Sequence, residues 1–309
     1  MSDLQTNSLR RDGRSRGGYK ILIYLLAVLA FSGSVSGSLY LWFSPAIAQY
    51  IEFGAFSFRL TEVLAIAGTI PLLMSLGLGG KSAWGLHHNS FWRIDLTQGL
   101  LLGIASLSVT CVLLLIFNLR VVRPDLITEF GHWFNVIIVS ALSATLIALI
   151  EEIWFRGALQ TVFTRVWGTF GGITVTAAFY AVAHFLRPSS DLNEQPVSAW
   201  SGFDAIASGF GNLQFVQMQD SLVALFFAGV VLGILRARQG SIVMCIGVHI
   251  GWVFVIKVYK KYTYINPQAE WNALVGHYDG VMGWLSAVLL VLLALTLWYT
   301  PRLMRSRQT

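Results

Sequence analysis

The stretch "NVIIVSALSATLIALIEEIWFRGALQTVF" (135–163) places three formal charges, Glu151, Glu152 and Arg156, inside an otherwise apolar segment. A helix needs about 20 mostly apolar residues to cross the hydrocarbon core of a bilayer, and this stretch is longer than that. An acid at the centre of such a helix costs about 2.5–3.5 kcal/mol on insertion scales, and such residues usually face the interior of a helix bundle. The stretch therefore predicts a membrane helix that carries a buried polar site.

The rest of the chain has the same apolar character. Its 309 residues are 55% hydrophobic and 12% charged, and the mean hydropathy is +0.65, whereas soluble domains are about 25% charged. We predict an all-α fold, a polytopic membrane helical bundle of about eight transmembrane helices. The predicted spans are 21–43, 59–78, 97–118, 134–166, 170–187, 221–237, 240–258 and 280–300. The fourth is too long for one simple crossing, so we expect it to tilt, break or extend beyond the bilayer.

The predicted organisation is one transmembrane domain (21–300) between a basic N-terminal tail (1–20) and a basic C-terminal tail (301–309). The bias of Lys and Arg places both tails on the cytoplasmic side, and a short chain of this type favours a prokaryotic inner membrane. The net charge of +6 does not indicate nucleic-acid binding, because the basic residues lie mostly at the chain ends and in short loops. The polar loop 188–220 fits either a solvated connection or a lid at the membrane surface.

The two glutamates differ in their local partners. Glu152 and Arg156 are four residues apart, so they share a helix face and can pair. Glu151 lies about 100° round the helix and has no such partner. Gly168 marks a plausible turn, and Glu151 and His184 lie at similar distances on either side of it, which predicts similar depths on adjacent helices. His249 lies within the seventh predicted span.

These side chains predict a buried polar site with several possible uses. A buried carboxylate is an effective base near neutral pH, and imidazoles can hold a water molecule or polarise a carbonyl. Two His and one Glu can also bind zinc, so we leave open a zinc site of Glu151, His184 and His249 or a site without metal. A helix-stabilising polar cluster and a proton relay of a transporter use the same residue types.

Three motifs in order resemble the CPBP family, the CAAX-protease and bacteriocin-processing intramembrane endopeptidases. "EEIWFRG" (151–157) fits its EExxxR motif, and "YAVAH" (180–184) and "HIGWV" (249–253) stand where the family has its two histidine motifs. The resemblance covers about 135–258. It implies an eight-helix intramembrane fold with a cavity among the fourth, fifth and seventh helices.

The resemblance also implies roles for the residues. Glu151 would be the base that activates water, and His184 and His249 would hold that water or stabilise the oxyanion. Glu152 and Arg156 match the supporting positions. The family is often described as metalloproteases, although a metal-free glutamate mechanism is also proposed for its eukaryotic CAAX-processing relatives.

Two positions depart from the family pattern. Tyr180 replaces a Phe and adds a hydroxyl, so we count it among the supporting residues. Val253 replaces a polar residue, and losing an oxyanion donor there would cost about 3 kcal/mol of transition-state stabilisation.

The function expected from these observations is an intramembrane endopeptidase that acts on a membrane-associated protein or peptide in the lipid bilayer. One alternative is a non-proteolytic scaffold or immunity factor of the same family. Another is a proton-coupled transporter, which the absence of an evident internal repeat makes the weaker reading.

Overall fold

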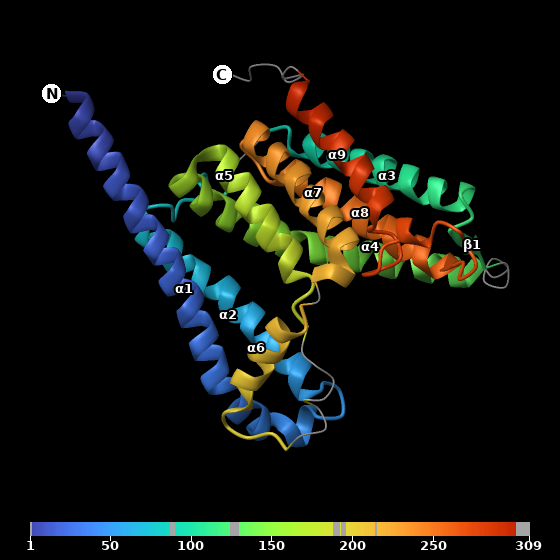
Figure 1. Cartoon of the computed structure of the whole chain (residues 1–309), viewed down its shortest axis with the longest axis horizontal. Coiled ribbons are helices and arrows are strands. Elements are labelled where there is room, and N and C mark those ends of the chain that lie inside the picture. The colour runs from blue at the N-terminus through green and yellow to red at the C-terminus, as the bar shows by residue number, and fades with distance from the viewer. Residues whose placement is uncertain are drawn as a thin grey trace. The chain divides into compact units, whose positions relative to one another are not determined.

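A computed structural model describes residues 2–86, 90–123, 130–187, 192, 196–213 and 215–300. The predicted all-α fold is confirmed in these ranges, apart from one small antiparallel pair of strands, β1 (Arg120–Val122) with β2 (Thr263–Ile265). The helices, shown in Figure 1, are α1 (Ser2–Ile47), α2 (Phe53–Ser75), α3 (Trp92–Ile116), α4 (Phe130–Glu152), the π-helical segment η2 (Ile153–Leu159), α5 (Gln160–Ala183), α6 (Ser201–Gly211), α7 (Phe215–Gln239), α8 (Val243–Tyr262), the short 3₁₀ turn η4 (Asn272–Leu274) and α9 (Trp284–Tyr299).

The described helices make this an integral membrane protein with several spans, as predicted, and the count of eight spans stays a prediction. Six helical segments are long and apolar enough to cross a bilayer. The fourth and fifth predicted spans both fall within one apolar run, 132–183, and they meet at Gly168, where the backbone leaves the helical conformation. The eighth predicted span is α9, which is apolar but shorter than the others.

The apolar run 132–183 is interrupted at Gly168, where the sequence predicted a turn. Its backbone has φ of 76° and ψ of 176°, a conformation that glycine adopts readily and other residues do not. The predicted loop 188–220 also contains ordered structure, since α6 lies within it. Residues 188–191, 193–195 and 214 of this loop lie outside the described residues, so the choice between a lid and a solvated connection stays a prediction.

The described residues group into two compact units. The first takes in Met1–Gly79, Val162–Gly168 and Val182–Gln214, and the second Gly80–Thr161, Thr169–Ala181 and Phe215–Thr309. In the first unit α1 packs against α2 and α6, around a small core of Tyr40, Phe53 and Ala205. In the second unit α8 packs against α3 and α4, and α7 packs against α9 (Figure 1). The division into tails and one domain 21–300 stays a prediction.

Glycines set the position of α8 in the second unit. They come in two pairs with four-residue spacing, Gly99 and Gly103 on α3 and Gly247 and Gly251 on α8. A Cβ atom on Gly103 would lie 2.3 Å from the carbonyl oxygen of Val248, and one on Gly247 would lie 2.3 Å from that of Leu96. Small residues at this spacing let two membrane helices approach to backbone contact. His249 stands between the two glycines of α8, so this contact also positions its imidazole.

We expect Gly103→Val to destabilise the second unit. The valine side chain has no room beside Val248, so α3 and α8 must separate, and overpacking of this kind costs about 1–3 kcal/mol. Thermal unfolding of the purified protein in detergent should show a lower midpoint than the wild type. Ala105→Val is the matched control, because Ala105 lies on an exposed part of α3; equal midpoints for both variants would contradict this interface.

Candidate active site

The site is built around η2, the π-helical turn that follows Glu152. Single π turns are rare and occur often at functional sites, because the wider turn shifts side chains and leaves carbonyl groups to other donors. Here the Arg236 guanidinium of α7 supplies two bonds, from Nε to the Arg156 carbonyl at 3.3 Å and from Nη2 to the Ala83 carbonyl at 3.0 Å. The Thr161 hydroxyl also donates to the Ala83 carbonyl, at 3.0 Å. The turn that carries the charged motif is therefore tied to two neighbouring segments.

Glu152 is the centre of the polar network. Its carboxylate is fully buried, and its Oε1 atom accepts a bond from Arg156 Nη1 at 2.9 Å. The predicted pairing of Glu152 with Arg156 is thus confirmed. The same oxygen also bonds His249 Nδ1 at 2.8 Å. Since an ionised carboxylate can only accept, Nδ1 is the nitrogen that carries the proton, and Nε2 of a neutral His249 is left with its lone pair.

Glu151 faces the other nitrogen of the same imidazole. Its Oε2 atom lies 3.8 Å from His249 Nε2, which is too long for a direct hydrogen bond. The Glu151 side chain is 26% exposed, but this Oε2 atom is buried and has no hydrogen-bond partner among the described residues. Two acceptors at this separation can be reached together by one water molecule that donates bonds of about 2.8 Å to each. His249 thus stands between two glutamates, held by one and facing the other.

Arg156 and Tyr180 pack against each other beside His249. The guanidinium carbon of fully buried Arg156 lies 4.5 Å from the centre of the Tyr180 ring, within the range of a cation–π contact. The Tyr180 ring also meets the His249 ring edge to face, with 6.3 Å between centres. Tyr180, predicted as a supporting residue, is therefore next to both the arginine and the histidine.

His184 and Val253 are the remaining sequence-predicted positions. His184 follows the end of α5 and belongs to the first unit, with residues 182–214, so its role in the site stays a prediction. Val253 lies four residues after His249 on α8 and is half-buried. The role of Glu152 as the partner of His249 was missed from the sequence, because the two residues are 97 positions apart and no local pattern links them.

The metal site that the sequence left open finds no support in the structure. Among the described residues, no group of three or more His, Cys, Asp or Glu side chains is placed to hold a metal ion. The label of metalloprotease is therefore not supported.

Apolar spanning helices around a buried cluster of two carboxylates, a guanidinium and an imidazole define a helical membrane protein with an intramembrane polar site. Comparison with known protein families gives the class of membrane protein. Residues 133–255 match the family described as Rce1-like type II CAAX prenyl endopeptidase, and this part of the chain is a domain of that family. The matched region holds all the site residues named above except Ala83. No match was found among curated proteins or among solved structures. Membership of this family implies an intramembrane protease, and with it a protein or peptide substrate.

Proposed function

We propose that the protein is an intramembrane endopeptidase in which Glu151 activates a water molecule to hydrolyse a peptide bond of a membrane-associated chain. The observation that carries the proposal is the line of three side chains, with Glu152 Oε1 2.8 Å from His249 Nδ1 and His249 Nε2 3.8 Å from Glu151 Oε2. This arrangement is that of a general base with an oriented imidazole beside it. All three residues lie within 133–255, the region that matches a family described as endopeptidases.

The proposed reaction uses the chain's own groups at each step. Glu152 holds His249 in one tautomer, so the Nε2 lone pair and the Glu151 carboxylate accept hydrogen bonds from the same water. As the water oxygen forms its bond to the carbonyl carbon, Glu151 takes one proton. It then gives that proton to the leaving nitrogen when the carbon–nitrogen bond breaks. We assign His184 a second contact with the water or the oxyanion.

Tyr180 is proposed as a hydrogen-bond donor to the oxyanion, since Val253 stands where the family has a polar residue. Tyr180→Phe removes only the hydroxyl and keeps the ring against Arg156. We expect kcat to fall by about 10²–10³-fold, the usual effect of removing one oxyanion donor, with KM little changed. Tyr299→Phe, at an exposed tyrosine, is the control. An unchanged kcat for Tyr180→Phe would remove Tyr180 from the mechanism.

A non-proteolytic member of the family is the second candidate, and Val253 is the observation that favours it. Quantitative analysis of protein termini in membrane fractions separates the two. Cells that contain the protein should show cleaved termini of one or more membrane-associated proteins, and cells that lack it should show the intact chains. Identical termini in both would favour the scaffold. The proposed orientation, with both ends of the chain in the cytoplasm of a prokaryotic cell, gives the side on which the cleaved products are first sought.

A further inference from the structure

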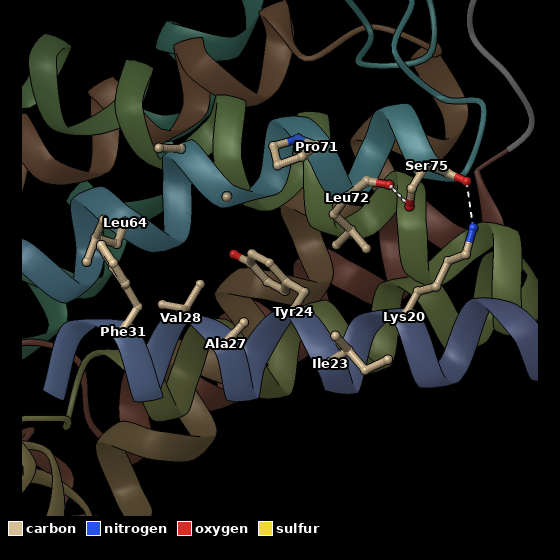
Figure 2. Close-up of a pocket in the computed structure, with 12 residues that line it drawn as sticks. Lys20, Ile23, Tyr24, Ala27, Val28, Phe31, Leu64, Pro71, Leu72 and Ser75 are labelled. Atoms are coloured by element: carbon tan, nitrogen blue, oxygen red, sulfur yellow. Dashed lines mark hydrogen bonds between the residues drawn. The ribbon is translucent and has the colours of Figure 1, made fainter. Parts of the chain in front are cut away.

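A groove between α1 and α2 lies in the first unit and contains none of the residues of the proposed active site. Its volume is about 550 Å³, within the range of about 300–1,000 Å³ that is typical of small-molecule sites. Figure 2 shows the side chains that line it from both helices. The larger apolar ones are Ile23, Val28, Phe31, Leu64, Pro71 and Leu72. Small residues, Ala27 on α1 and Ala67 and Gly68 on α2, leave the space between them.

Hydrogen bonds hold the wall of the groove in place. The Tyr24 hydroxyl donates to the Ala65 carbonyl at 2.6 Å and lies 3.0 Å from the Thr69 hydroxyl, so its ring is fixed between the two helices. A Cβ atom on Gly68 would lie 3.1 Å from that ring, tighter than an ordinary contact. The groove is therefore built into the packing of α1 on α2.

One end of the groove carries a cation. Lys20 Nζ donates to the Ser75 carbonyl at 2.7 Å, as the dashed line in Figure 2 shows, and this bond uses one of the three donors of an ammonium group. Lys20 lies near the start of the apolar segment Gly18–Ile47, where a spanning helix meets the headgroup region. The lining is otherwise apolar apart from Tyr24 and Ser75, whose hydroxyl groups are hydrogen-bonded to carbonyls of α2.

We propose that this groove binds an acyl chain of an anionic phospholipid, with the lipid phosphate paired to Lys20. An apolar groove between two membrane helices takes hydrocarbon, because water inside it would have too few polar partners. Basic residues at the end of a span attract anionic headgroups, which selects an anionic lipid over a neutral one. The Lys20 ammonium group at one end and the apolar groove along the helices together fit a molecule with a phosphate group and a long hydrocarbon chain.

The test uses the full-length protein, stripped of lipid in detergent and then given phosphatidylglycerol or phosphatidylcholine. Bound lipid is counted by native mass spectrometry. We expect the wild type to retain phosphatidylglycerol, and Lys20→Gln to retain about fivefold less, the factor that one lysine contributes near an anionic surface. Lys81→Gln, at an exposed lysine outside the groove, should retain as much as the wild type.

Filling the groove tests the place of the acyl chain. Ala67→Phe should abolish retention, whereas Ala30→Phe, at an exposed alanine of α1 outside the groove, should not. Ala27→Phe serves if Ala67→Phe does not fold, because it fills the same space from α1. Unchanged retention in the filled variants would overturn the site. Equal retention of both lipids by the wild type would overturn the role of Lys20.

Discussion

Glu151→Gln is expected to lower kcat by about 10²–10⁴-fold, the contribution of a positioned general base, while the protein accumulates in the membrane at the wild-type level. The amide has the shape of the carboxylate and still accepts a hydrogen bond from water, but it cannot take the proton that attack releases. Stability should change little, because Glu151 is partly exposed and is not paired with Arg156. The measurement is the rate of cleavage of a membrane-associated substrate in proteoliposomes.

The control for this variant is Glu270→Gln. It makes the same chemical change at an exposed position in the second unit, so it should leave both kcat and yield unchanged. Full activity of Glu151→Gln would reject the glutamate base. Loss of the protein from the membrane together with loss of activity would instead give Glu151 a structural role.

Arg156→Met is expected to give the largest loss of stability. Removing the guanidinium leaves the Glu152 carboxylate buried without its cation, and breaking a buried ion pair from one side costs about 3–5 kcal/mol. The free energy of unfolding, measured by titrating a folded detergent sample with denaturing detergent, should fall by that amount. Arg59→Met is the control, since its pair with Glu62 is exposed and exposed pairs contribute about 0–1 kcal/mol.

A second variant separates charge burial from loss of packing. Glu152→Gln combined with Arg156→Met removes both charges, so much of the lost stability should return. Activity should stay low in the double variant, because the neutral amide no longer holds His249 as a carboxylate does. A double variant as unstable as Arg156→Met alone would mean that packing of the guanidinium against Tyr180, and not charge, stabilises the site.

Local parts of the site could be predicted from the sequence because they depend only on helix geometry. The pairing of Glu152 with Arg156 needs four-residue spacing on one helix, and the interruption at Gly168 needs a residue that tolerates positive φ. The helical class and the membrane setting followed from the length and apolarity of the segments.

The contacts between distant segments could not be predicted in the same way. The bond from His249 to Glu152 depends on how α8 packs against α3 and α4. The four-residue glycine spacing on α3 and α8 allows a close approach but does not say which helices meet. The π turn after Glu152 changes the phase of the helix, so depth estimates based on a straight α-helix do not hold across it. The strands β1 and β2 are three residues each, too short for a period of two to be recognised.

A single-turnover reaction in H₂¹⁸O tests the central claim most directly. Enzyme is kept in excess over substrate, and the new C-terminus of the product and the enzyme peptide containing Glu151 are both weighed by mass spectrometry. If Glu151 activates water, the product carboxyl carries one ¹⁸O atom and the Glu151 peptide carries none. A product without label, or label found on Glu151, would contradict the account, because the carboxylate would then attack the peptide bond itself.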